Sequence, residues 1–326
     1  MSFWRGHKVL VTGAGGFVGG HLAAALVAQG AEIVALVLDW QPRSTLVLLG
    51  AAEQVTRVYG SVTDAALMHR TLNAYEVDTV FHLAAQALVG VARRSPVTTL
   101  EANVRGTWTV LEACRLSETV ERVVVASSDK AYGSQPHLPY REDFPLRGRY
   151  PYEASKACAD LIARCYAATY DLPVAVTRCA NIYGPGDLNF SRLVPDTIRA
   201  LLDNRPPLIR SDGTPTRDYL YIEDAVRAYL MLGEQVRQPA VQGEAFNFGT
   251  GRPVSVLELV RLLIAVSGRD LEPEVQGTAR GEIGHQYLDS SKAERILGWQ
   301  AEVSLEEGLR RTWEWYAAQP WLQPDS

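Results

Sequence analysis

Cysteine is scarce in this chain of 326 residues, which contains only Cys114, Cys158, Cys165 and Cys179. No two of them have the C-x-x-C spacing of a redox or metal site, and no metal-ligand spacing surrounds any of the six histidines. We therefore expect no bound metal and a reduced, cytoplasmic protein. Cys158 and Cys165 fall within one expected helix and are predicted to be buried as small hydrophobic residues. His82 is expected to pack in the core.

A surplus of basic residues is also missing. Lys and Arg together number 32 against 37 Asp and Glu, which gives a net charge of −5. The sequence therefore lacks the basic cluster that a phosphate backbone would need, and we expect no nucleic-acid partner.

Long hydrophobic runs are absent as well. The apolar runs are too short to cross a bilayer, and the N-terminal sequence MSFWRGHKVLVTG lacks the apolar core of a signal peptide. We therefore expect no membrane partner. Hydrophobic residues still make up 47% of the chain, enough for a large core, and the length permits two domains or one large domain with an appended lobe.

The N-terminal half alternates between apolar strands and helices. This order predicts a parallel sheet covered on both faces, so the expected fold class is α/β with a doubly wound sheet of the Rossmann type. The strands are expected at residues 8–13, 31–39, 55–64, 78–85, 120–128 and 172–181. The helices are expected at residues 19–30, 65–74, 95–116 and 150–170, the third with Ser95 as N-cap.

The alternation stops after Asn181. The sequence IYGPGDLNFSRLVPD is rich in glycine and proline, and shorter helices and loops follow it. One more strand, at residues 244–251, is expected to return to the sheet. We therefore predict a Rossmann domain of residues 1–180 with a return segment at about 219–250, and a smaller substrate-binding lobe of residues 181–218 and 251–326.

The segment VTGAGGFVGGHL lies between an expected strand and an expected helix. Gly13 permits the tight turn, Gly16 lets the backbone approach a pyrophosphate, and Gly19 lets the helix pack against the strand. The N-terminus of the helix, where Phe17 and Val18 lie, faces the anion. A purely structural glycine-rich turn is the alternative, but the strand–turn–helix context favours a dinucleotide site.

Asp39 ends the second expected strand. A carboxylate there accepts both hydroxyls of an adenosine ribose and repels a 2′-phosphate, which favours NAD over NADP. A solvent-exposed strand end is the alternative for Asp39, and Arg43 keeps NADP open. Asp64 is either close to the adenine or the N-cap of the next helix. The other residues expected to line the cofactor site are Val62, Leu83, Ala84 and Ala85.

Tyr152 and Lys156 in YPYEASK are four residues apart, so they lie on one face of a helix. A nearby ammonium lowers the pKa of a phenol and makes it a usable base. Ser128, at the end of the preceding expected strand, is in a position to hold a substrate hydroxyl. Chance alone produces many Y-x-x-x-K sequences, but the position after a nucleotide-type sheet favours a catalytic role.

With these motifs in place, the sequence resembles the extended short-chain dehydrogenase/reductase family of NAD-dependent sugar-nucleotide epimerases and dehydratases. The resemblance covers nearly the whole chain and is carried by TGAGGFVGGHL, HLAAQ, NVRGTWTVLEAC, SSDKAYG, YPYEASK, RCANIYGPGD, RLVPD, TRDYLYIEDA, NFGTG and LDSSKAERILGW. It implies that Tyr152 is the active-site base, that Lys156 assists it and binds the nicotinamide ribose, and that Ser128 is the hydroxyl partner.

Two charged residues, Asp129 and Lys130, directly follow Ser128. In epimerases of the family these positions are usually small or neutral, whereas 4,6-dehydratases carry an acid and a second acid/base group. The Asp-Lys pair is similar to that of CDP-glucose 4,6-dehydratases and some UDP-sugar dehydratases. A dehydratase needs a base for the C5 proton and an acid for the leaving O6, so Asp129 would act protonated and Lys130 neutral. A surface ion pair is the alternative.

The resemblance also implies a nucleotide-sugar substrate. Asn181 and Arg192 would contact the nucleotide sugar, Arg217 and Arg280 would hold the diphosphate through bidentate bonds, and Gln86 would reach the hexose. Taken singly, each arginine would be interpreted as a solvated surface residue, and only the motif around it favours a binding role. The segment TRDYLYIEDA is more similar to dTDP-glucose dehydratases and epimerases than to CDP-glucose enzymes, so the nucleotide base stays open.

The helices expected at 95–116 and 150–170 form a four-helix dimer interface in this family, so we expect a homodimer. Three functions stay open. The first is an NDP-hexose 4,6-dehydratase acting on a CDP-glucose, dTDP-glucose or GDP-mannose type of substrate with recycled NAD. The second is an NAD-dependent nucleotide-sugar 4-epimerase in which Asp129 and Lys130 only position the substrate. The third, a non-catalytic NAD-binding regulator, is disfavoured by the intact Tyr-Lys pair.

Overall fold

The computed structural model describes residues 2–278 and 283–322. Its centre is a seven-stranded sheet in the spatial order β3-β2-β1-β4-β5-β6-β11, in which every neighbouring pair is parallel. The predicted Rossmann-type α/β fold is confirmed. The strands are β1 (Lys8–Thr12), β2 (Glu32–Val37), β3 (Thr56–Tyr59), β4 (Thr79–His82), β5 (Arg122–Ala126), β6 (Val174–Cys179) and β11 (Ala245–Phe248).

Alternate residues along the strands face two separate cores. Val9 and Val11 of β1 belong to one core, and Leu10 between them belongs to the other. In β5, Val124 belongs to the first core and Val123 to the second. A strand buried on both faces needs an apolar residue at every position, which explains the continuous apolar runs in the sequence.

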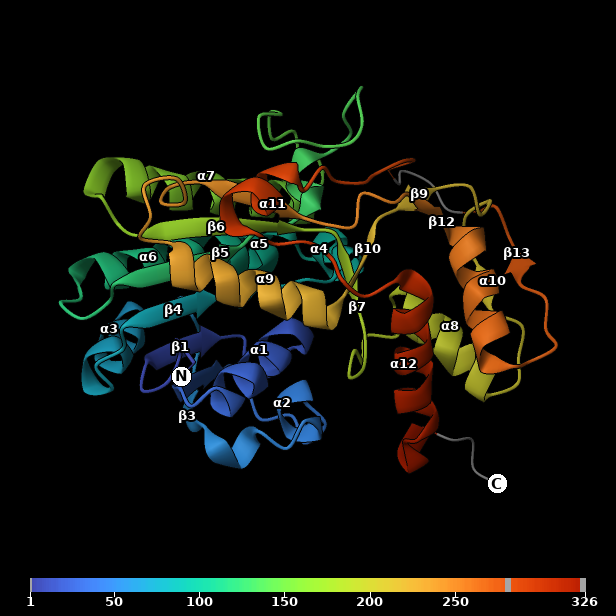
Figure 1. Ribbon diagram of the computed structural model, residues 1–326, viewed down its shortest axis with the longest axis horizontal. Helices are drawn as coiled ribbons and strands as arrows, with labels where there is room; N and C mark the ends of the chain where they lie inside the picture. Colours follow the sequence, from blue (N-terminus) through green and yellow to red (C-terminus); the bar gives the residue numbers. More distant parts are fainter. Residues whose placement is uncertain (1, 279–282, 323–326) are drawn as a thin grey trace.

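Helices cover both faces of the sheet (Figure 1). The first core is closed by α1 (Phe17–Ala28) and α9 (Ile222–Gln235). The second core is closed by α3 (Ala65–Ala74), α6 (Gly106–Leu116) and α7 (Pro151–Tyr170). Within the described ranges, no helix is both long and apolar enough to cross a membrane.

The helix predicted over residues 95–116 is interrupted. It consists of α5 (Pro96–Leu100), a π-helical turn at Glu101–Arg105 and α6, and it is preceded by a short helix α4 (Val89–Arg94) that was not predicted. Ser95 holds the N-cap position of α5, but its side chain makes no capping bond and pairs with the Thr98 hydroxyl instead. A π turn inserts a residue without changing the residue types of a helix, so the pattern did not reveal it.

Several predicted boundaries also move by a few residues. The third strand is only four residues long, because it lies at the sheet edge and meets Gly60 at a φ of +151°. The second strand ends at Val37, so Asp39 lies in the loop that follows it. The first helix begins at Phe17, earlier than expected, and the return strand β11 pairs with β6.

A second group of elements stands at one end of the sheet, on the right of Figure 1. It contains the helices α8 (Leu193–Leu202), α10 (Val256–Ser267) and α12 (Leu305–Ala317). The domain limits given above stay a prediction. The remaining elements are α2 (Thr45–Leu48), α11 (Ser291–Leu297), the 3₁₀ turns Ala52–Gln54, Asp129–Tyr132 and Pro320–Leu322, and the short strands β7 (Asn181–Tyr183), β8 (Leu208–Ile209), β9 (Thr216–Arg217), β10 (Tyr219–Tyr221), β12 (Val254–Ser255) and β13 (Glu274–Val275).

Candidate active site

Glycines shape the loop between β1 and α1. Gly13 has a φ of +73°, and a Cβ atom there would lie only 2.8 Å from the amide nitrogen of Ala84. A Cβ atom on Gly19 would collide with the carbonyl oxygen of Gly13. Gly16 caps α1 without any side-chain bond. The loop therefore offers close backbone approach and a helix N-terminus, which fit the pyrophosphate of a dinucleotide.

The two acidic residues expected near the adenosine, Asp39 and Asp64, differ in their hydrogen bonding. Asp39 is exposed just beyond β2, and its contact with the ribose stays a prediction. The Asp64 carboxylate accepts a hydrogen bond of 2.9 Å from the amide of Leu67, so the N-cap alternative is confirmed. Arg43, which kept NADP open, lies with its guanidinium 4.7 Å from the ring centroid of Trp321.

The other residues expected to line the cofactor site follow the carboxyl ends of β3 and β4. The amides of Leu83 and Ala84 both donate to the Thr12 hydroxyl at 3.1 Å, which holds the loop through Ala85 against β1. Val62 is buried, whereas Leu83, Ala84 and Ala85 are partly buried. Their contacts with the cofactor stay a prediction, as do those of Phe17 and Val18 at the start of α1.

Tyr152 and Lys156 lie one turn apart on α7. Lys156 is buried, and its Nζ donates to the carbonyl of Ala126 at 2.8 Å. Burial lowers the pKa of Lys156 to about 8. Burial also raises the pKa of Tyr152, and Arg192 and the Ser128 hydroxyl oppose that rise. The expected lowering by Lys156 is therefore wrong for this structure, because the amine is turned toward the β5 carbonyl and burial dominates.

Ser128 and the two charged residues after it form one compact turn. The Ser128 hydroxyl accepts a hydrogen bond from the Lys130 amide at 3.2 Å and donates to Asp129 Oδ1 at 3.0 Å. Lys130 Nζ lies 3.0 Å from Asp129 Oδ2, and the two side chains are 20% and 3% exposed. The surface ion pair considered above is therefore excluded. Burial lowers the pKa of Lys130, an effect that Asp129 opposes and Arg217 reinforces.

Residues from two distant segments complete this cluster. Lys130 Nζ also donates to Asn181 Oδ1 at 3.2 Å and to Gln286 Oε1 at 2.7 Å. The Gln286 amide nitrogen in turn donates to the main-chain oxygen of Asp129 at 2.8 Å. Asn181 was expected near the substrate, but no sequence signal pointed to Gln286, which is 156 residues from Lys130 along the chain.

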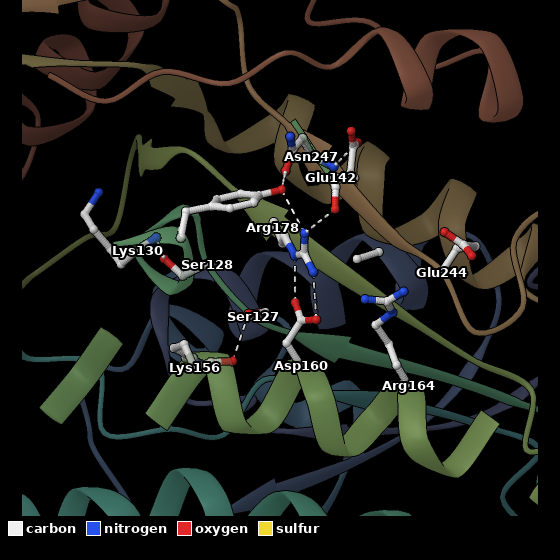
Figure 2. Close-up of polar contacts among 12 residues, drawn as sticks. Ser127, Ser128, Lys130, Glu142, Lys156, Asp160, Arg164, Arg178, Glu244 and Asn247 are labelled. Atoms are coloured by element: carbon white, nitrogen blue, oxygen red, sulfur yellow. Dashed lines mark hydrogen bonds and ion pairs between the residues drawn. The ribbon is translucent and has the colours of Figure 1, made fainter. Parts of the chain in front are cut away.

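A second charged network lies beside the turn and was not predicted. Arg178 of β6 binds Asp160 of α7 through two hydrogen bonds of 2.7 and 2.8 Å, and both side chains are almost fully buried. A third bond of 2.8 Å joins Arg178 to the hydroxyl of Tyr132, which donates to Asn247. Figure 2 shows the Arg178 guanidinium facing the Asp160 carboxylate, with Lys156 farther along the same helix. The only available signal was a carboxylate four residues after Lys156, on the same helix face.

The predicted substrate residues are held in different ways. Arg192 Nη1 lies 2.9 Å from Asp187, and Arg217 donates to the carbonyls of Thr216 and Gly284. The Gln86 side-chain oxygen accepts a bond from a neighbouring amide at 2.8 Å. Arg280 lies outside the described residues. The substrate contacts of all these residues stay predictions.

The predictions for His82 and the cysteines had different outcomes. His82 is buried between the Thr12 and Thr107 hydroxyls, and burial lowers its pKa to about 3, so its place in the core is confirmed. Cys158 is only partly buried and Cys165 is exposed, so their predicted burial is wrong. Cys165 shares its side of α7 with the exposed residues Leu161 and Thr169, so this side of the helix is open to solvent.

Comparison with known proteins identifies the family. Residues 9–249 match the family described as the NAD dependent epimerase/dehydratase family. The chain belongs to this family. The resemblance inferred from the motifs is thereby confirmed. The predicted cofactor, NAD, is confirmed as well.

Within the epimerase/dehydratase family, relatives of two activities are equally similar to the chain. A UDP-glucose 4-epimerase from Mycolicibacterium smegmatis is 33% identical over 317 residues, which cover 95% of this chain and 98% of the relative. A dTDP-glucose 4,6-dehydratase from Streptomyces griseus is also 33% identical, with 97% and 96% covered. The dTDP-glucose 4,6-dehydratase from Streptomyces venezuelae, solved with NAD bound, superimposes with a TM-score of 0.87 at 31% identity and covers 97% of this chain and 98% of its own.

Proposed function

We propose that the protein is an NDP-hexose 4,6-dehydratase that converts a nucleotide-linked hexose to its 4-keto-6-deoxy product. The observation that carries the proposal is the buried Asp129–Lys130 pair, held 3.0 Å apart directly after Ser128. An epimerase that only returns hydride to the other face of C4 needs neither group. Overall similarity does not discriminate, since a 4-epimerase and a 4,6-dehydratase are both 33% identical to the chain.

In this proposal Tyr152 takes the proton from O4, with Ser128 holding that hydroxyl. Bound NAD supplies the acceptor of the C4 hydride and later the donor of hydride to C6. The 4-ketone acidifies the C5–H, and Lys130 Nζ takes that proton. Asp129 gives its proton to O6, which leaves as water, and a C5–C6 double bond forms. After hydride reaches C6, Lys130 returns its proton to C5. The proton that Asp129 gave to the departing water is replaced by the one that Tyr152 took from O4, so the site ends as it began.

The resting ion pair supports this sequence of proton transfers. Moving one proton from Lys130 Nζ to the Asp129 carboxylate across their 3.0 Å contact creates a neutral amine and a protonated acid, the two forms that elimination requires. No proton has to be exchanged with solvent. The lowered pKa of Lys130, caused first by burial, favours this transfer.

A panel assay tests the proposal. The NAD-loaded protein is incubated with CDP-glucose, dTDP-glucose, GDP-mannose and UDP-sugars, and the sugar nucleotides are followed by mass spectrometry. Loss of one water from any of them supports the dehydratase. Unchanged mass with altered stereochemistry at C4 would establish the epimerase instead, and no reaction with any sugar would favour the regulator. Tyr152→Phe is the inactive control.

We propose as well that the protein is a homodimer formed through the helices 96–116 and α7. Their outer faces carry large exposed apolar side chains, among them Trp108 at 45% and Leu161 at 56% exposure. Light scattering at micromolar concentration should give the mass of a dimer. Leu161→Glu should give the mass of a monomer, whereas Val275→Glu, at an exposed apolar position on β13, should leave the dimer intact. A parent protein that is a monomer would refute the proposal.

A further inference from the structure

Gln286 is a fully buried polar side chain that belongs to none of the sequence motifs. Both ends of its amide are bound to the turn after Ser128: Oε1 accepts from Lys130 Nζ at 2.7 Å, and Nε2 donates to the Asp129 carbonyl at 2.8 Å. A buried amide without hydrogen-bond partners destabilises a fold, so these two contacts are needed to keep Gln286 buried. Gln286 therefore bridges the two residues of the acid/base pair.

The contacts of Lys130 match the donors of an ammonium group. A protonated lysine has three N–H donors and no acceptor. Lys130 Nζ has three side-chain partners, namely Asp129, Asn181 and Gln286, and the bond to Gln286 is the shortest at 2.7 Å. A neutral amine has two donors and a lone pair, so one of these oxygens would face the lone pair. Each acceptor therefore stabilises the protonated form.

We infer that Gln286 is a positioning residue whose amide fixes the direction of the Lys130 amine and holds it in its protonated resting form. The consequence for catalysis rests on the proposed dehydratase function, but the bonding does not. Gln286 acts through Lys130, and nothing in its geometry requires contact with substrate.

The segment that carries Gln286 also joins the turn to the substrate-binding side. The main-chain amide of Gln286 donates to the carbonyl of Thr216 at 3.1 Å, next to Arg217 of β9. The carbonyl of the next residue, Tyr287, accepts from the amide of Tyr140 at 2.9 Å. The main chain of Gln286 is therefore fixed on both sides, and its side-chain amide cannot turn away from Lys130 without losing its bonds to Lys130 and to the Asp129 carbonyl.

Other groups act on Lys130 from the elements packed around it. Asp129 and Glu153 favour its charged form, whereas burial and Arg217 disfavour it. The phenols of Tyr140 and Tyr152 face the same cluster, and burial raises the pKa of both. Gln286 carries no charge. Replacing it by an apolar residue therefore changes the bonding of Lys130 without changing the number of charges.

The chain offers a direct test, because its only lysines are Lys8, Lys130, Lys156 and Lys292. We would label the full-length, NAD-loaded protein with [ε-13C]lysine and titrate it by NMR, assigning Lys130 from the signal that disappears in Lys130→Met. Gln286→Leu removes an acceptor and should lower the pKa of Lys130 by about one pH unit, and Gln286→Glu adds a carboxylate and should raise it by about as much. The titrations of Lys8 and Lys292 should not move.

Identical titration of Lys130 in the parent and in both variants would overturn the inference. Gln286→Met, which preserves side-chain length, replaces Gln286→Leu if that variant loses the native Lys292 signal. Gln286→Glu preserves the size of the side chain and the oxygen that accepts from Lys130 Nζ, so we expect this variant to fold.

Kinetics add an independent readout in the proposed dehydratase. The active pair must keep one proton for transfer from Lys130 to Asp129, so the rate of water loss falls as the pH rises through the pKa of Lys130. Gln286→Leu should shift this fall to lower pH, and Gln286→Glu should shift it to higher pH, while oxidation at C4 keeps its own pH profile. If no sugar nucleotide loses water in the parent protein, the proposed function fails, and the NMR titration still decides the role of Gln286.

Discussion

Two buried ion pairs lie at opposite ends of the same 3₁₀ turn, and they are built for different tasks. At one end, Asp129 and Lys130 form a pair in which the lysine is 20% exposed. At the other end, Tyr132 binds Arg178, whose pair with Asp160 is at most 1% exposed. A guanidinium cannot lose its proton in a protein, whereas a buried lysine can. The comparison shows that one turn contacts both a permanently charged pair and a pair whose lysine can lose its proton, and the proposed function assigns the chemistry to the second.

Replacing Lys130 by methionine should remove the ion pair with Asp129 and, in the proposed function, the base for the C5 proton. Loss of a general base reduces a rate by 10²–10⁴-fold, so we expect water loss to fall by about 10³-fold. Oxidation at C4 depends on Tyr152 and should survive, which the absorbance of the reduced cofactor would report. Lys292→Met serves as the control, since Lys292 lies outside the cluster. Unchanged water loss in Lys130→Met would remove Lys130 from the mechanism.

Replacing Arg178 by methionine should remove the permanently charged ion pair with Asp160. Asp160 would be left buried without a partner, which destabilises a fold by about 3–5 kcal/mol. The free energy of unfolding from urea titration would show this loss, and the double variant Arg178→Met/Asp160→Leu should recover most of it. If Arg178→Met unfolds at the same urea concentration as the parent, the pair contributes no stability.

His82 extends the comparison from the two ion pairs to a buried titratable side chain whose partners are the neutral hydroxyls of Thr12 and Thr107. The unfolded chain takes up a proton at this residue below about pH 6.5, whereas the folded chain keeps His82 neutral down to a pKa of about 3. The unfolded state therefore binds more protons, and stability falls as the pH drops from 6.5. We expect a loss of about 2 kcal/mol between pH 6.5 and 4.5. Urea titrations of His82→Gln should show a flatter pH dependence, and an equal slope would contradict the assignment.

A pair at the surface should give the smallest effect. Lys292 and Glu244 lie 2.6 Å apart, but Glu244 is 43% exposed. Water screens such a pair, so Glu244→Gln should change the free energy of unfolding by at most about 1 kcal/mol. A loss as large as that of Arg178→Met would show that exposure is not what separates the pairs.

The sequence predicted the parts of the fold that depend on local pattern. Apolar strands, the glycines of the first loop and the spacing of Tyr152 and Lys156 all express requirements of nearby backbone, so the sheet and the helix face could be inferred. The π turn at 101–105 could not, because an inserted residue leaves helix-forming residue types unchanged. The bond from Lys156 to the Ala126 carbonyl was also invisible, since every residue has a carbonyl.

The cluster around Lys130 was only half predictable. Asp129 is its neighbour in sequence, and Asn181 belongs to a motif. Gln286 meets Lys130 only because the chain returns past β9 after 156 residues, and no local pattern encodes that meeting. Arg178 and Asp160 were missed for a related reason: a buried charge is identified by its partner, and their partnership crosses from a strand to a helix.

The late position of Gln286 has a consequence for biosynthesis. A chain leaving the ribosome completes its glycine loop early, and N-terminal parts fold first. The amide that contacts Lys130 lies 156 residues after it and is therefore synthesised later than all seven strands of the central sheet. A nascent chain thus carries its glycine loop and its Asp129–Lys130 pair before the residue that bridges this pair exists, so the polar contacts of Lys130 are completed only late in translation.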